Sequence, residues 1–122
     1  MYEIVVDGSF CATHALRLPG GETEPLHGHD WRVSVCLAAE TLDHTGFVAD
    51  FEDVQRRLNA LTGELHHTCL NDHSWLAGVN PTAENLARVV FERLSCVTPL
   101  GDALLSVTIV ETPGCRARYV RP

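Results

Sequence analysis

Three histidines near the N-terminus could together hold a metal ion. His27 and His29 flank Gly28 at the start of a stretch rich in β-forming residues, and alternate positions of a strand point to one face. His14 closes the preceding β-rich stretch. If the two stretches pair as a hairpin, the imidazoles can converge, and three imidazoles with a vacant fourth position are the ligand set of a catalytic zinc site. Three imidazoles would also accept copper or nickel. On their own, His27 and His29 could equally be turn histidines, and His14 a partly buried core residue.

The elements that must position these histidines follow from the hydrophobic pattern and its breakers. Stretches of β-forming residues separated by turn residues predict paired strands, and apolar residues at helical spacing predict two helices. The strands are expected at 2–15, 26–40, 103–112 and 115–120, and the helices from Asp50 to Gly63 and from Asn80 to Val97. This order predicts one α+β domain over residues 1–122, a four-stranded antiparallel sheet with both helices on one face. The open sheet edges and the bare second face predict an oligomer.

Composition and charge exclude several classes of protein. The chain has 122 residues, 45% of them hydrophobic, and a net charge of −7 with nine arginines and no lysine, which argues against binding to nucleic acid. No apolar run is long enough for a membrane helix, and the chain begins with Met1, Tyr2 and Glu3 instead of a basic signal segment, so we expect a cytoplasmic protein. The five cysteines lie far apart without a C-x-x-C pair and indicate neither a disulfide framework nor a thiolate zinc cluster.

Five short motifs lie in order along nearly the whole chain. They are FCATH at 10–14, LHGH at 26–29, GFVADF at 46–51, NPTAE at 80–84 and VET at 110–112. Together they resemble the motifs of the 6-pyruvoyltetrahydropterin synthase and 6-carboxytetrahydropterin synthase family. The resemblance implies the tunnelling fold and a homohexamer made of two trimers, with active sites at subunit interfaces. It also implies Zn²⁺ on His14, His27 and His29, and a substrate like 7,8-dihydroneopterin triphosphate.

The resemblance also implies two residues that hold the substrate. Glu111 matches the glutamate that anchors the pterin ring, and a carboxylate can accept two parallel N–H bonds from the 2-amino and N3 edge of that ring. From the residues alone, a solvent-exposed strand end describes Glu111 equally well. Thr82 matches a position that helps to hold the pterin, and it is also placed to cap a helix. Both roles of Thr82 can coexist.

The expected catalytic groups depart from the pattern of the family. Members with the namesake activities carry a catalytic Cys where this chain has Thr23, and an Asp-His pair where it has His66 and His67. A threonine hydroxyl does not replace a thiolate without further activation. Glu24 resembles the glutamate of a subtype that lacks the Cys and cleaves the substrate side chain to give 6-hydroxymethyl-7,8-dihydropterin. The alternatives are a solvated acidic loop for Glu24 and a surface pair for His66 and His67.

Two functional hypotheses follow. The first is a zinc-dependent lyase acting on a dihydropterin, in which Glu24 moves a proton and His67 assists. The second is a protein that binds a pterin or a purine-like molecule but has lost the reaction, because Thr23 and His66 replace two catalytic groups of the family. In both cases the expected partner is a small molecule, with neither nucleic acid nor a membrane involved.

Overall fold

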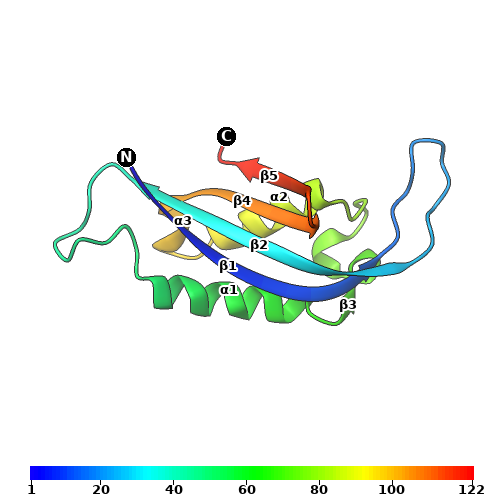
Figure 1. Cartoon of the computed structure of the whole chain (residues 1–122), viewed down its shortest axis with the longest axis horizontal. Helices are drawn as coiled ribbons and strands as arrows, with labels where there is room; N and C mark the ends of the chain where they lie inside the picture. The colour runs from blue at the N-terminus through cyan, green and yellow to red at the C-terminus, as the bar shows by residue number, and fades with distance from the viewer.

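A computed structural model describes all residues from Met1 to Pro122 and shows one curved sheet with its helices on one face (Figure 1). The strands are β1 (Tyr2–His14), β2 (His27–Ala39), β3 (Thr68–Cys69), β4 (Leu104–Thr112) and β5 (Cys115–Val120). The helices are α1 (Phe51–Leu65), α2 (Ala83–Ser95) and the single turn α3 (Leu100–Ala103). Two short 3-10 helices, Leu70–Asp72 and Ser74–Leu76, follow β3. No helix is both long enough and apolar enough to cross a membrane.

The sheet has five strands in the order β3-β1-β2-β4-β5. β1 and β2 pair antiparallel along their whole length, from Tyr2 opposite Ala39 to His14 opposite His27. β3 pairs parallel to β1 at Ala12 and Thr13. The α+β class is confirmed, and the four predicted antiparallel strands are present. The parallel fifth strand, β3, was not predicted, because two residues are too few to show an alternating pattern.

Both long helices begin at the side chains that the sequence indicates. The Asp50 carboxylate accepts the N–H of Glu52 at 2.9 Å, and the Thr82 hydroxyl accepts the N–H of Asn85 at 3.1 Å. α1 continues past Gly63, which was expected to end it, because fully buried Leu65 still belongs to its apolar face. α2 ends at Ser95, two residues before the expected end.

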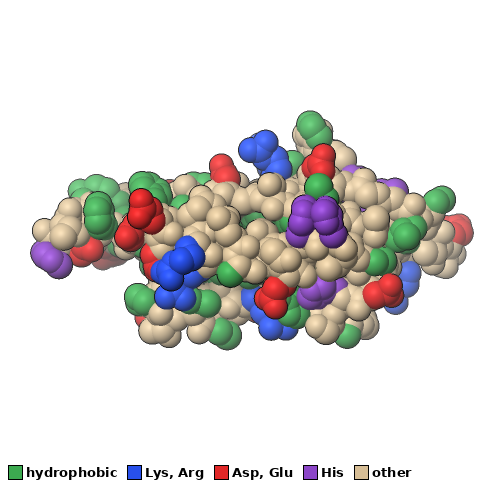
Figure 2. Space-filling view, turned by 90° about the horizontal axis from the view of Figure 1, so that it is seen from below, with side chains coloured by type: hydrophobic (Ala, Val, Ile, Leu, Met, Phe, Trp, Pro, Cys, Tyr) green, Lys and Arg blue, Asp and Glu red, His purple; other side chains and the backbone are tan.

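The core lies between the sheet and the helices. α1 packs against β1, and α2 packs against β4 and β5. Buried residues alternate with more exposed ones along β1, and the buried series Phe10, Ala12 and His14 runs from the core to the end of the strand. The alternation that builds the core therefore also carries His14 to its place. On the face shown in Figure 2, acidic and basic side chains are dispersed and form no continuous basic surface.

Candidate active site

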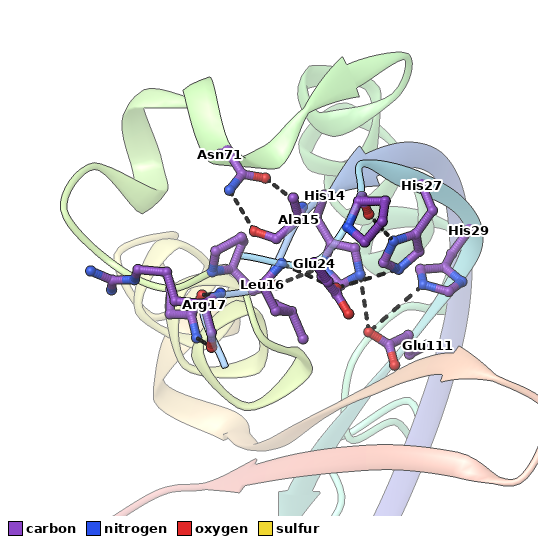
Figure 3. A network of polar contacts seen from close by, with 12 residues as sticks. His14, Ala15, Leu16, Arg17, Glu24, His27, His29, Asn71 and Glu111 are labelled. Carbon is purple, nitrogen blue, oxygen red and sulfur yellow. Dashed lines mark hydrogen bonds and ion pairs between the residues drawn. The ribbon is translucent and has the colours of Figure 1, made fainter. Parts of the chain in front are cut away.

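The three histidines gather where β1 and β2 leave the core. His14 lies directly opposite His27, and His29 lies opposite Ala12, so all three side chains share the face that the helices cover. Their ligand atoms lie within 4.8 Å of one another, and the His14 side chain is fully buried. Figure 3 shows the three rings converging from the two neighbouring strands. The convergence expected from strand alternation is thus present.

Backbone carbonyls orient two of these rings. Nδ1 of His14 lies 2.8 Å from the carbonyl oxygen of Pro81, and Nδ1 of His27 lies 2.8 Å from that of Pro25. Because a carbonyl can only accept, each Nδ1 carries a hydrogen, and Nε2 is the ring atom left to bind a metal. Nε2 of His14 and Nε2 of His29 are buried without any hydrogen-bond partner. Buried polar atoms normally find partners, so these two unpartnered nitrogen atoms fit a bound cation.

Trp31 supports the cluster from the core side. Its indole N–H donates to the carbonyl oxygen of Ala12 at 3.1 Å. Its ring lies 4.9 Å from that of His14 and 5.2 Å from that of His29, nearly perpendicular to both. A fully buried tryptophan therefore limits the movement of two of the three imidazoles.

Two carboxylates flank the histidines. Oε1 of Glu111 lies 3.3 Å from Nε2 of His14 and 3.9 Å from Nε2 of His29. On the other side, Oε1 of Glu24 lies 3.6 Å from Nε2 of His27 and accepts the N–H of Leu16 at 3.0 Å. Burial lowers the pKa of His29 below its ordinary value, as do the two neighbouring imidazoles, while the Glu111 charge opposes the shift. A neutral imidazole is the form that binds a metal.

Two asparagines hold the chain that follows His14, and their role was not recognised in the sequence. Asn71 accepts the N–H of Ala15 at 2.8 Å and donates to its carbonyl at 2.7 Å. Asn80 does the same for Arg17, at 2.9 and 3.0 Å. These paired hydrogen bonds resemble those between neighbouring strands, and they continue the pairing of β1 beyond its last residue. Asn80 lies in the NPTAE motif, but its place at the start of the predicted helix indicated only a helix cap.

The remaining predicted residues lie around this centre. Thr23 is exposed, and only its backbone pairs, in an isolated bridge with Arg17. Thr82 caps α2 directly after Pro81, the residue that holds His14. The Thr82 side chain is thus engaged with the helix start beside the cluster.

His66 and His67 do not contact the three clustered histidines directly, but His67 lines the same hollow of about 440 Å³ as His29. The N–H of Cys11 donates to Nδ1 of His66 at 3.0 Å, and the N–H of His67 donates to the Cys11 carbonyl at 2.7 Å. Their rings stack at 3.7 Å, both residues are exposed, and His67 adopts a left-handed backbone with φ of 60°. Such a backbone is uncommon outside glycine. Within one chain, no hydrogen bond, ion pair or ring contact joins them to the cluster.

A pocket of about 380 Å³ opens beside Glu111. It lies between the first turn of α2, at Ala83 and Glu84, and the edge strand β5, at Arg116 and Arg118. Two other hollows, of about 440 and 680 Å³, lie along β1 and β2 and share Asp30. Glu111 thus borders a pocket and lies beside His14 and His29, while His29 itself lines the hollow of about 440 Å³.

Comparisons with known proteins agree with the arrangement. The family model described as 6-pyruvoyl tetrahydropterin synthase matches residues 3–122. The 6-carboxy-5,6,7,8-tetrahydropterin synthase of Synechocystis is 35% identical over 127 residues, which cover 100% of this chain and 95% of that protein. The enzyme of the same name from Bacillus subtilis is 27% identical, over 98% of this chain and 78% of that protein. The solved structure of Caenorhabditis elegans 6-pyruvoyl tetrahydropterin synthase matches with a TM-score of 0.88 at 25% identity, over 99% of this chain and 96% of that one.

Proposed function

Because the chain belongs to the 6-pyruvoyl tetrahydropterin synthase family, we propose that it is a zinc-dependent lyase. The proposed reaction takes place on the side chain of a reduced pterin such as 7,8-dihydroneopterin triphosphate. The observation that carries this proposal is the set of three histidine ligand atoms within 4.8 Å of one another. Glu24 and Glu111 flank this set and supply the acid-base and binding groups that such a reaction needs. Zn²⁺ on His14, His27 and His29 would polarise the oxygen atoms of the substrate side chain.

Recognition of the heterocycle is assigned to Glu111. Its carboxylate accepts the 2-amino and N3 hydrogens of the pterin, which form two parallel donors. The adjoining pocket of about 380 Å³ is within the size range of small-molecule sites. Thr82 supports this wall by holding the start of α2. The pterin ring would thus lie between α2 and the end of β4.

Proton transfer is assigned to Glu24. Its Oε1 atom accepts the N–H of Leu16, which holds the carboxylate beside His27 and leaves Oε2 free. Oε2 takes the proton from the 2′-hydroxyl of the substrate, the bond between C1′ and C2′ breaks, and C2′ becomes an aldehyde carbon. The bonding electrons move into the pterin ring, and protonation at C1′ then gives 6-hydroxymethyl-7,8-dihydropterin. A base of this kind contributes about 10²–10⁴-fold to the rate.

A second candidate function rests on Thr23. The motif resemblance matches Thr23 to the family's catalytic Cys, and Thr23 is exposed without a side-chain hydrogen-bond partner. A protein that keeps the histidines and Glu111 but lacks the base would bind a pterin and leave it unchanged.

The proposed assembly is a homohexamer, a dimer of trimers with active sites between subunits. The outer edge of β1 is unpaired except where β3 covers Ala12 and Thr13, and the outer edge of β5 is unpaired throughout. His66 and His67 are exposed beside the β1 edge, so a neighbouring subunit could use them, with His67 assisting proton transfer there. Sedimentation equilibrium should give about six times the chain mass of 13.4 kDa. A monomer at micromolar concentration would contradict the assembly.

The reaction is tested by incubating the zinc-loaded protein with 7,8-dihydroneopterin triphosphate and identifying the pterin product by chromatography and mass spectrometry. Glu24→Gln should lower kcat by about 10²-fold or more, because the amide cannot take the proton. Glu22→Gln is the matched control, since Glu22 is exposed on the same loop, and it should retain the wild-type rate. Turnover that survives Glu24→Gln would exclude Glu24 as the base. Binding without any product would favour the second candidate.

A further inference from the structure

We propose that Glu111 is the fourth ligand of the metal before substrate arrives, and that the heterocycle draws its carboxylate away when it binds. The exchange rests on the proposed function, because it needs a pterin that Glu111 can bind. The ligand role does not, because it is argued from the atoms of the chain alone.

One distance matches a shared coordination sphere and a second is about half an ångström longer. In a tetrahedral site with bonds of about 2.0–2.1 Å, neighbouring ligand atoms lie about 3.3–3.4 Å apart. Oε1 of Glu111 lies 3.3 Å from Nε2 of His14 and 3.9 Å from Nε2 of His29. The same oxygen thus faces both of the buried nitrogen atoms that have no hydrogen-bond partner. Figure 3 shows the Glu111 side chain directed at the converging rings.

The electrostatics of this contact favour a positive charge between the two atoms. Nδ1 of His14 lies 2.8 Å from the carbonyl oxygen of Pro81, so Nε2 is the ring atom that faces Glu111 and is available to a metal. A carboxylate oxygen against a buried lone pair is repulsive, because two acceptors face each other with little water to screen them. A metal ion bound by both atoms turns the repulsion into attraction.

Glu111 is also the carboxylate that is free to leave. Glu24 is held by the N–H of Leu16, whereas no group of the chain donates a hydrogen bond to Glu111. The Glu111 side chain retains 27% of its exposure and borders the pocket beside α2. Rotation about its side-chain bonds can therefore turn the carboxylate from the histidines to a pterin edge in that pocket. Substrate binding and the opening of a coordination position would then be one event.

The test uses Co²⁺ in place of zinc, because the visible absorption of Co²⁺ depends on the number and kind of its ligands. The Co²⁺ spectrum and dissociation constant are measured for the full chain and for Glu111→Gln, which keeps the side-chain shape but removes the charged ligand. Glu84→Gln is the matched control: it removes a charge from the same pocket wall, and Glu84 has no ion-pair contact with a histidine. The second measurement adds 6-methylpterin, whose side chain offers no oxygen to the metal, and follows its binding by fluorescence.

We expect Glu111→Gln to change the Co²⁺ spectrum and to weaken Co²⁺ binding by about 10-fold or more, with Glu84→Gln like the wild type. Adding 6-methylpterin should move the wild-type spectrum toward that of Glu111→Gln. A Glu111→Gln protein with the wild-type spectrum and affinity would overturn the ligand role. If Glu111→Gln does not fold, a wild-type spectrum unchanged by bound 6-methylpterin overturns the exchange. If 6-methylpterin does not bind while the spectral difference between wild type and Glu111→Gln persists, the ligand role stands and the pterin function fails.

Discussion

Nδ1 of His14 and the carbonyl oxygen of Pro81 lie 2.8 Å apart, across 67 positions of the chain. This bond ties the last residue of β1 to the residue before the cap of α2. The orientation of a candidate metal ligand therefore depends on how α2 begins. Substitutions at the start of α2 should therefore alter metal binding by the histidine cluster even though they replace no ligand.

Thr82→Ala tests this dependence. The substitution removes the hydroxyl that accepts the N–H of Asn85 and should cost about 1 kcal/mol of unfolding free energy. It should also weaken metal binding, because the Pro81 carbonyl loses its fixed position. Urea denaturation and a zinc titration measure the two effects. Thr82→Ser keeps the hydroxyl and should restore both, so an equal loss in the serine variant would refute the cap as the cause.

Asn71→Ala should destabilise the end of β1. Asn71 makes two hydrogen bonds with the backbone of Ala15, and their loss should cost about 1–2 kcal/mol in urea denaturation. Asn59→Ala is the control, since Asn59 lies exposed on α1 and its side chain accepts only from Gln55. Equal stabilities of the two variants would show that the hydrogen bonds between Asn71 and Ala15 do not stabilise the fold.

Trp31→Phe should reduce both stability and metal affinity. The variant leaves the buried Ala12 carbonyl without the indole donor, which alone costs about 1–3 kcal/mol, and it loosens the packing against His14 and His29. Trp75→Phe is the matched control, because Trp75 is half-buried and lies under Arg93, away from the cluster. A zinc affinity of Trp31→Phe equal to that of Trp75→Phe would contradict the supporting role.

Cys11 should resist alkylation. Its thiol donates to Oδ1 of Asp30 at 2.8 Å, and this hydrogen bond, together with burial and the Asp30 charge, raises the pKa of Cys11 above its ordinary value of 9.0. A raised pKa leaves less thiolate at any pH below it, so at pH 8 iodoacetamide should modify Cys11 more slowly than exposed Cys96 and Cys115. Asp30→Asn removes the charge and should speed the reaction of Cys11. Peptide mass spectrometry gives the three rates, and an unchanged Cys11 rate in Asp30→Asn would rule out this cause.

The sequence predicted the elements with strong periodic patterns. β1, β2, β4 and β5 are long enough to alternate, and both long helices carry recognisable caps and apolar faces. β3 was missed because two residues cannot display a period, and its parallel pairing with β1 depends on the chain returning after α1. The extension of α1 past Gly63 reflects burial of Leu65, which outweighs the low helix propensity of glycine.

The site was predictable as far as strand geometry determines it. Alternation placed His14, His27 and His29 on one face, and the hairpin register brought them together. Alternation contains no information on side-chain rotation, so the approach of Glu111 to within 3.3 Å of His14 was not predicted. No sequence pattern predicts that the carbonyls of Pro25 and Pro81 contact His27 and His14, because every residue has a backbone carbonyl.

The metal content of the purified chain tests the central claim most directly. After equilibration with Zn²⁺ and removal of the excess, elemental analysis should find about one ion per chain in the wild type and in His44→Gln, whose histidine lies exposed on a loop. His14→Gln should hold close to none. A wild type without stoichiometric zinc, or a His14→Gln variant that holds as much as the wild type, would contradict the account.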